Sequence, residues 1–365
     1  MIVLALTVAL VAAACSSSSG ASSQHAANGA TATTAGPSVE PAGVSALPAQ
    51  RSVGCAAKGA AAHPVKTGEV TLSLLSGGKV RTYLRYVPPG VSPTTPLPIV
   101  LDLHGLGSNM TQQEAVTEFE KLAATEHFIV LTPNGLDSRW NTIDQRPNAD
   151  VFFIEQLLDR TMLQQCVDAA RVYSTGYSDG GLMSSVLACQ LANRITAIAV
   201  VSGLTHGPGC RPSRPVPVMV FWGEQDLVLP FYGGLGEALR DLLSGKPIPA
   251  NLKAPTAPVA HQDGFPPVEQ VVSAWADTDG CPSPPAKVEV ASDVQERIYY
   301  ECRDAASIRF YVVSDGGHAW PGSEIESAAG AANPTGQAAI IGYTTMKIDA
   351  TDLIWKFFSQ YARSS

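Results

Sequence analysis

The chain has 365 residues, of which 45% are hydrophobic and 15% are charged. That balance is ample for a sizeable hydrophobic core, and it excludes a chain that is disordered throughout. The net charge is −8 at pH 7 and no long basic run occurs, which argues against nucleic acid as a partner.

The N-terminus has the features of an export signal. Residues 2–14 form an apolar run that is too short to span a bilayer comfortably but suits the hydrophobic region of a signal peptide. The small residues before Cys15 resemble a bacterial lipobox, in which the cysteine is lipidated. The alternative is an ordinary signal peptide with Cys15 near its cleavage site. No Lys or Arg precedes the run, so an upstream start codon stays open.

Residues 16–51 are predicted to be a disordered linker. They are mostly Ser, Ala, Gly, Thr and Pro, a composition that buries too little apolar surface to offset its ordering entropy. We therefore expect a signal peptide over 1–15 and a folded domain over 52–365. The protein is expected to be secreted or held at the cell envelope, with membrane contact only through a lipid on Cys15.

Seven cysteines are present, and six remain when Cys15 is set aside. An even number in an exported protein suggests three disulfides, with buried free thiols as the alternative. Cys281 and Cys302 flank a predicted hairpin and are expected to pair. No Cys-x-x-Cys motif or His/Cys cluster has zinc-like spacing, so no metal is predicted.

The other two disulfides are assigned from the expected path of the chain. Cys166 precedes a predicted strand, and Cys189 lies on the helix that follows that strand. Because such a helix returns antiparallel to its strand, we expect Cys166 to pair with Cys189. That leaves Cys55 to pair with Cys210.

The periodicity predicts strands that alternate with helices. Alternating runs at 69–75 and 79–87 predict an antiparallel hairpin. Apolar runs predict buried strands at 98–103, 128–132, 172–175, 195–202, 217–222 and 308–313. Helices are predicted at 111–126, 150–164, directly after 178, and at 268–277 and 348–361. This alternation predicts an α/β fold, with a mostly parallel central sheet, helices on both faces and catalytic groups at the carboxyl ends of strands.

The motif Gly176-Tyr177-Ser178-Asp179-Gly180 lies between a predicted strand and a predicted helix. This is G-x-S-x-G in the context that a nucleophile requires. A serine that attacks a carbonyl must project from a sharp turn, and Gly176 and Gly180 leave room there. The helix after Ser178 directs free N–H groups at developing negative charge. The alternative is a Gly-rich turn in which Ser178 only caps the helix.

Two further polar residues follow predicted strands. Asp226 comes after the strand that ends at Trp222, and His318 comes after the strand that ends at Val313. The order Ser178, Asp226, His318 is the order of the α/β-hydrolase triad. In that interpretation His318 removes the proton of the Ser178 hydroxyl, and Asp226 holds the imidazole and stabilises its charged form. The alternatives are a turn-capping aspartate and a surface histidine.

The remaining candidates are rival acids and oxyanion donors. Glu224 and Asp315 compete with Asp226 for the role of the acid, but their register after the strands is less suitable. The backbone N–H groups of Asp179 and Leu106 are the candidate oxyanion hole. His104, in the same loop as Leu106, is expected to be structural.

With these motifs the chain resembles the secreted polyhydroxybutyrate-depolymerase/feruloyl-esterase family of α/β hydrolases, which includes mycobacterial lipoproteins. The matching motifs include His104-Gly105, Trp140-Asn141, Gly176 to Gly181, and Gly316-Gly317-His318-Ala319-Trp320-Pro321-Gly322. The resemblance implies an α/β-hydrolase fold and a serine carboxylesterase without metal or cofactor. Its substrates would be feruloyl or acetyl esters, or polyhydroxyalkanoate-type polyesters.

Three departures leave the substrate open. Asp179 stands where the family usually has Asn, and residues 222–224 replace its usual His-Gly. Residues 236–266 are longer than expected and suggest a lid. Trp140 and Trp320 are candidate walls for an aromatic or polymeric acyl group, with a place in the core as the alternative. An exported acyltransferase, a peptidase and a non-catalytic envelope-binding module on the same fold are the alternative functions.

Overall fold

The computed structural model describes residues 47–56, 66–246, 248–249, 252–257, 264–332 and 340–364. The expected signal peptide, Cys15 and most of the expected linker lie outside the described residues. So do residues 247, 250–251 and 258–263 of the expected lid. Among the helices that are described, none has the length and apolar character needed to cross a membrane.

Contacts with the folded domain begin slightly before Ser52, the expected domain boundary. The backbone N–H of Gln50 donates to Asp168 Oδ1 at 2.9 Å, and Arg51 forms an isolated antiparallel bridge with Asp168. The last residues of the predicted linker are therefore attached to the domain, and the short helix η1 (Val53–Ala56) follows them directly.

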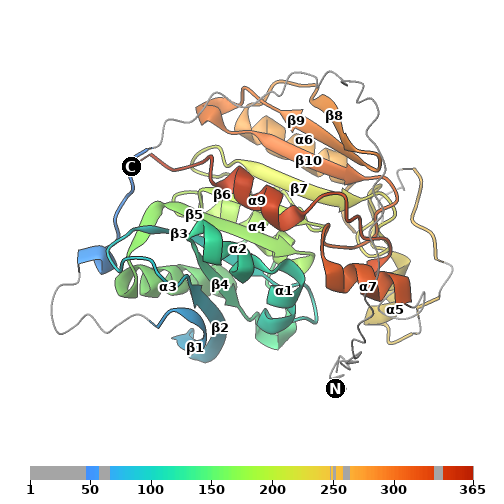
Figure 1. Ribbon diagram of the computed structural model, residues 1–365. Helices are drawn as coiled ribbons and strands as arrows, with labels where there is room; N and C mark the ends of the chain where they lie inside the picture. Colours follow the sequence, from blue (N-terminus) through green and yellow to red (C-terminus); the bar gives the residue numbers. More distant parts are fainter. Residues whose placement is uncertain are drawn as a thin grey trace, which may run out of the picture. The chain divides into compact units, whose positions relative to one another are not determined.

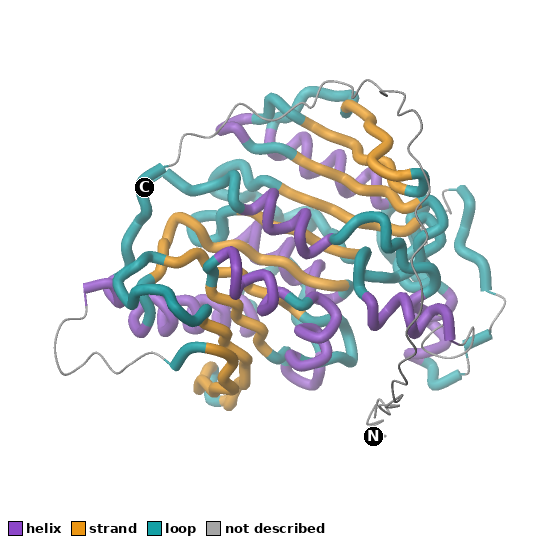
Figure 2. Tube along the Cα trace, in the orientation of Figure 1, coloured by secondary structure: helices purple, strands orange, loops and turns teal. Residues whose placement is uncertain are grey.

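The described strands form one ten-stranded sheet in the order β1-β2-β4-β3-β5-β6-β7-β10-β9-β8 (Figures 1 and 2). Their bounds are β1 Gly68–Ser76, β2 Lys79–Val87, β3 Leu97–Leu103, β4 Ile129–Pro133, β5 Val167–Tyr177, β6 Ala197–Val201, β7 Val218–Gly223, β8 Ala286–Ala291, β9 Val294–Tyr299 and β10 Ile308–Val313. The six strands from β4 to β10 in this order are parallel, and β2 and β9 pair antiparallel at either side of them. This confirms the predicted α/β-hydrolase architecture.

Helices cover both faces of this sheet. Their bounds are α1 Met110–Thr117, α2 Phe119–Glu126, α3 Ala149–Gln164, α4 Asp179–Gln190, α5 Glu237–Leu243, α6 Val268–Asp279, α7 Glu324–Ala332 and α9 Ala350–Phe358. Residues of α3, α4 and α6 pack in one core, and residues of α2 and α9 pack in a second (Figure 1). Strand β3 supplies both cores, because Ile99 and Leu101 face the first and Val100 faces the second.

The helix predicted at 111–126 is two helices in the structure. Glu118 adopts a left-handed backbone conformation, φ 53°, which ends α1 and begins α2. The N-cap of α1 is Asn109, whose side chain accepts the N–H groups of Thr111 and Gln112. The break follows Thr117, whose hydroxyl donates to the buried Asp102 of β3 at 2.7 Å. A buried polar contact therefore fixes the end of α1.

Three disulfides join the remaining six cysteines: Cys281–Cys302, Cys55–Cys166 and Cys189–Cys210. The first is as predicted, but the pairing of Cys166 with Cys189, and hence of Cys55 with Cys210, is wrong. A strand rises about 3.3 Å per residue and a helix about 1.5 Å. Because α4 and β5 have similar numbers of residues, α4 returns along only about half of β5, and Cys189 stays far from Cys166.

Candidate active site

Ser178 lies in the sharp turn between β5 and α4. Its backbone has φ 54° and ψ −117°, which is strained for a residue with a side chain. A Cβ added to Gly176 would lie 2.3 Å from the carbonyl carbon of Gly180, and one added to Gly180 would lie 1.9 Å from the Leu103 oxygen. Both glycines are thus required, as the motif predicts. Gly203, which the sequence analysis did not single out, is equally constrained: its Cβ would lie 2.0 Å from the Ser178 oxygen.

Asp226 and His318 follow the neighbouring parallel strands β7 and β10. Both side chains are buried, and His318 Nδ1 lies 2.7 Å from Asp226 Oδ2. The other carboxylate oxygen accepts the N–H groups of Val228 and Leu229, each at 2.8 Å. These two bonds fix the orientation of the carboxylate. Because Nδ1–H donates to Asp226, Nε2 is the ring nitrogen that can accept a proton.

The rival acids have other surroundings. Glu224 is half-buried, and burial raises the pKa of its carboxyl, which the nearby Arg297 opposes. Asp315 is exposed. Within the described part of the chain, neither carboxylate forms a hydrogen bond with His318. Asp226 is therefore the acid that the geometry pairs with this histidine.

The loop after β3 lies against Ser178. A Cβ added to Gly105 would be 3.4 Å from Ser178 Cβ. The backbone N–H groups of Leu106 and Asp179 form no hydrogen bond to any of the described residues, and Asp179 is the first residue of α4. Free amides at this position are suited to stabilise negative charge.

The side chains of His104 and Trp140 form hydrogen bonds with the backbone of this loop. The fully buried His104 accepts the Gly135 N–H at Nε2, 2.9 Å away, and its Nδ1 lies 2.8 Å from the Gly105 carbonyl. Burial lowers the pKa of His104, while the Gly105 carbonyl opposes that change. With Nε2 occupied by an N–H donor, the imidazole cannot act as a base. This agrees with the predicted structural role.

The two tryptophans that were candidate pocket walls are buried. Trp140 is 4% exposed, donates its indole N–H to the His104 carbonyl and donates its backbone N–H to Asp179 Oδ2 at 2.8 Å. Trp320 is 1% exposed and donates its indole N–H to Thr351. This burial favours the alternative of a place in the core for both tryptophans, and their role as pocket walls stays a prediction. The position of a residue next to a motif in the sequence does not determine which way its side chain points in the fold.

The expected lid begins against the loop that carries Asp226. The Gly236 N–H donates to the Val228 carbonyl at 3.0 Å, and a Cβ on Gly236 would lie 1.9 Å from the Leu227 oxygen. Helix α5 follows directly. The role of this segment as a lid stays a prediction.

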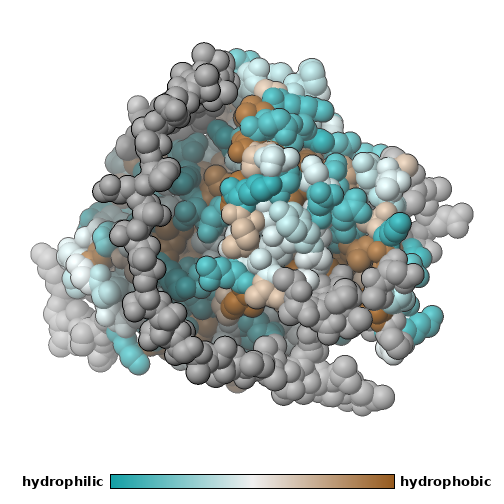
Figure 3. All heavy atoms as spheres, turned by 45° about the vertical axis from the view of Figure 1, so that its right-hand side comes forward, coloured by the Kyte–Doolittle hydropathy of each residue, from teal (hydrophilic) through white to brown (hydrophobic). Residues whose placement is uncertain are grey.

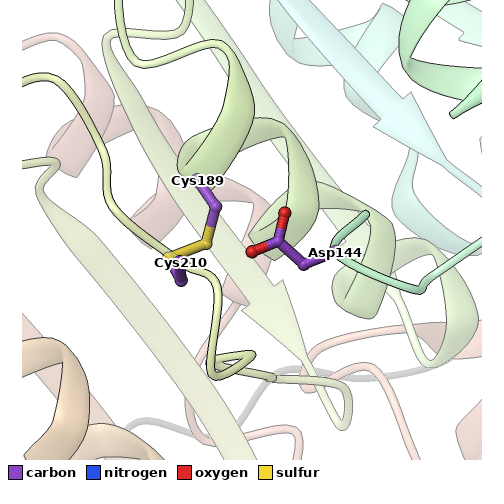
Figure 4. A group of neighbouring side chains, drawn as sticks. All are labelled: Asp144, Cys189 and Cys210. Carbon is purple, nitrogen blue, oxygen red and sulfur yellow. A yellow bond between two sulfur atoms is a disulfide. The ribbon is translucent and has the colours of Figure 1, made fainter. Parts of the chain in front are cut away.

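Asp144, Cys189 and Cys210 gather at the other end of α4 (Figure 4). A carboxylate oxygen and both sulfur atoms lie within 4.8 Å of one another. The two sulfurs are bonded to each other, so they are not the thiolates that bind metals. A cavity of about 550 Å³ opens at this cluster. It lies at the C-terminal end of α4, whereas Ser178 lies at the N-terminal end.

Among the described residues that Figure 3 shows, hydrophobic residues form separate patches between hydrophilic ones. Large exposed hydrophobic residues include Leu106, which is 43% exposed in the loop after β3, and Ile143, which is 60% exposed. Leu106 is therefore accessible to a ligand that approaches Ser178.

The strand order, together with a strained serine after the central strand β5, defines an α/β hydrolase. The chain is 31% identical over 217 residues to a probable feruloyl esterase C of Aspergillus clavatus, covering 58% of this chain and 75% of the relative. It is 25% identical over 307 residues to a putative esterase NocK of Nocardia uniformis, covering 80% and 83%. The chain belongs to the feruloyl esterase family of serine carboxylesterases. No family model matches it.

Some relatives are much longer than this chain. Feruloyl esterase B of Piromyces equi is 27% identical over 242 residues, which is 64% of this chain but 41% of the relative. A bifunctional acetylxylan esterase/xylanase of Neocallimastix patriciarum matches over 21% of its length. Among solved structures, an acetyl xylan esterase from Aspergillus awamori aligns with 68% of this chain and 94% of its own, at 15% identity and a TM-score of 0.48. That value is too low to add to the assignment.

Proposed function

We propose that this protein hydrolyses carboxylic esters through an acyl-enzyme, with feruloyl or acetyl esters or polyhydroxyalkanoate-type polyesters as substrates. The observation that carries the proposal is the 2.7 Å contact of the buried Asp226 with His318, whose ring lies 5.2 Å from that of Tyr177, the residue before Ser178. Membership of the feruloyl esterase family supports ester chemistry. The names of several relatives support the feruloyl and acetyl substrates.

In the proposed reaction, Ser178 Oγ attacks the carbonyl carbon while its proton passes to His318 Nε2. Asp226 stabilises the imidazolium that forms. The tetrahedral oxyanion accepts the N–H groups of Leu106 and Asp179, each worth about 3 kcal/mol in the transition state. The alcohol leaves with the proton from His318, and Ser178 keeps the acyl group. Water then attacks the acyl-enzyme by the same route and releases the acid.

The test compares wild-type protein with Ser178→Ala on methyl ferulate, an acetylated xylan oligomer and a hydroxybutyrate oligomer. We expect hydrolysis of one of them, with kcat at least about 10⁴-fold lower in the variant. Ferulate or acetate release would indicate a plant-polymer esterase, and cleavage of the hydroxybutyrate oligomer alone would indicate a polyester depolymerase. A fluorophosphonate probe should label the wild type at Ser178. Activity that survives in Ser178→Ala, or folded wild-type protein that is not labelled, would contradict the mechanism.

We also propose that residues 52–365 form the catalytic domain and that a lipid on Cys15 holds it at the cell envelope. Three disulfides support an extracytoplasmic location, because disulfides persist in oxidising compartments. Metabolic labelling with palmitate should mark the wild type in a bacterial host and should not mark Cys15→Ser. Equal labelling of the two proteins would exclude this anchor.

A further inference from the structure

Two contacts outside the Ser–His–Asp set hold the loop that carries His318. The Tyr177 hydroxyl donates to the His318 carbonyl, and the two rings lie 5.2 Å apart. Two residues further on, the Trp320 backbone N–H donates to Glu326 Oε2. Tyr177 directly precedes Ser178, so the loop is linked to the turn of the nucleophile as well as to α7.

Glu326 is a buried carboxylate that the proposed mechanism does not use. It lies in the first turn of α7 and is 4% exposed. Burial raises the pKa of its carboxyl to about 7, and the Trp320 N–H, the nearby His318 and the Tyr177 hydroxyl oppose that rise. Burying a carboxylate is costly unless nearby groups compensate it. Among the described residues, the hydrogen bond to this carboxylate comes from the Trp320 N–H of the His318 loop.

Two side chains of the site face this carboxylate. His318 faces it from the loop after β10, and Tyr177 faces it from β5. Asp226 lies on the other side of the imidazole, bonded to Nδ1. Glu324, on the same helix as Glu326, is exposed to solvent. Glu326, unlike Glu324, is therefore in place to hold the His318 loop.

We propose that Glu326 is a positioning residue for the esterase reaction, because it holds the His318 loop through the Trp320 amide. This inference rests on the proposed function of His318 as the base. The loop contact keeps the imidazole in register with Ser178, and a displacement of about 1 Å at such a site costs up to 10²-fold in rate.

Glu326→Ala tests this contact and Glu326→Gln is the conservative variant, with Glu324→Gln as a matched control. Gln keeps an acceptor for the Trp320 amide, so its kcat and KM should stay within about threefold of wild type. Ala removes the acceptor, and kcat should fall about 10- to 100-fold with less than about threefold change in KM. Glu324→Gln, the same change at an exposed position of α7, should leave both unchanged.

A measurement without substrate makes the inference independent of activity. In Ser178→Ala protein, the NMR resonances of the His318 ring should move when Glu326→Ala is added, because the loop is released, and should stay in place with Glu326→Gln and Glu324→Gln. If wild-type protein hydrolyses no ester, the proposed function fails while these spectra still test Glu326. Unchanged His318 resonances together with a wild-type kcat in Glu326→Ala would overturn the inference. If Glu326→Ala does not fold, Glu326→Asp, whose shorter side chain withdraws the acceptor, takes its place in the same measurements.

Discussion

The carboxylate of Asp179 lies beside the proposed oxyanion site. Its backbone N–H is one of the two proposed donors, and its side chain accepts the Trp140 N–H at 2.8 Å. Burial raises the pKa of this carboxyl to about 6; the Trp140 amide and Arg139 oppose the rise, and Asp150 adds to it. An ionised carboxylate next to a developing oxyanion opposes its formation, whereas the protonated acid does not. Titration of Asp179, the residue after the nucleophile, should therefore add a pH dependence of its own to the rate of the reaction.

Asp179→Asn should raise kcat about two- to tenfold at pH 7.5, because Asn is neutral and its side-chain oxygen still accepts the Trp140 N–H. The difference should shrink below pH 6, where wild-type Asp179 is protonated. Pre-steady-state acylation measured from pH 5 to 8 tests this, with the exposed Asp137→Asn as the control. A variant slower than wild type at every pH would show that the carboxylate assists the reaction.

The raised pKa of Asp179 also affects the free energy of unfolding. The direction of this pH dependence is opposite to that of a carboxylate in a salt bridge, whose pKa is lowered. Since the folded pKa of about 6 lies above the usual value of 3.8, the folded state holds the proton more tightly. The contribution of Asp179 to wild-type stability should therefore fall as the pH rises from about 4 to 6 and then level off. Asp179→Asn should remove that loss, so its Tm should exceed that of wild type at pH 7 but not at pH 3.5.

At the scale of elements, patterns in the sequence predicted those parts of the fold that apolar burial determines. The continuous apolar run of β3 predicted a strand covered on both faces, and its residues do alternate between the two cores. The register after β7 and β10 likewise predicted that Asp226 and His318 would meet, because the carboxyl ends of parallel strands share one edge of the sheet.

The features that the sequence did not predict depend on tertiary contacts, which produce no periodic pattern of hydrophobic residues. Helix α7 is built largely from small residues, and nothing in its sequence distinguishes the buried Glu326 from the exposed Glu324. The break between α1 and α2 falls at Glu118, which is not a typical turn residue that would have predicted it. The burial of Trp140 and Trp320 depends on which way each side chain points from its loop. Each of these features depends on where a side chain points and which residue it contacts, and a sequence pattern contains neither.

At the scale of the whole described domain, the three disulfides close loops of two sizes. Cys55 and Cys166 are 111 residues apart, whereas Cys189–Cys210 and Cys281–Cys302 each span 21. The long one ties the N-terminal segment that contains η1 to the residue just before β5. If the stabilisation comes from restricting the unfolded chain, it grows with the logarithm of loop length.

Replacing both cysteines of a pair by Ala should therefore lower the unfolding free energy by about 5 kcal/mol for Cys55–Cys166 and by about 3 kcal/mol for each of the other two. Urea denaturation of the three double variants measures this, and the two 21-residue loops are matched controls for each other. The long disulfide has this effect only if the segment around Cys55 unfolds together with the sheet. A loss for Cys55–Cys166 smaller than for either control would mean that this segment detaches first, and would place the start of the cooperative domain after it.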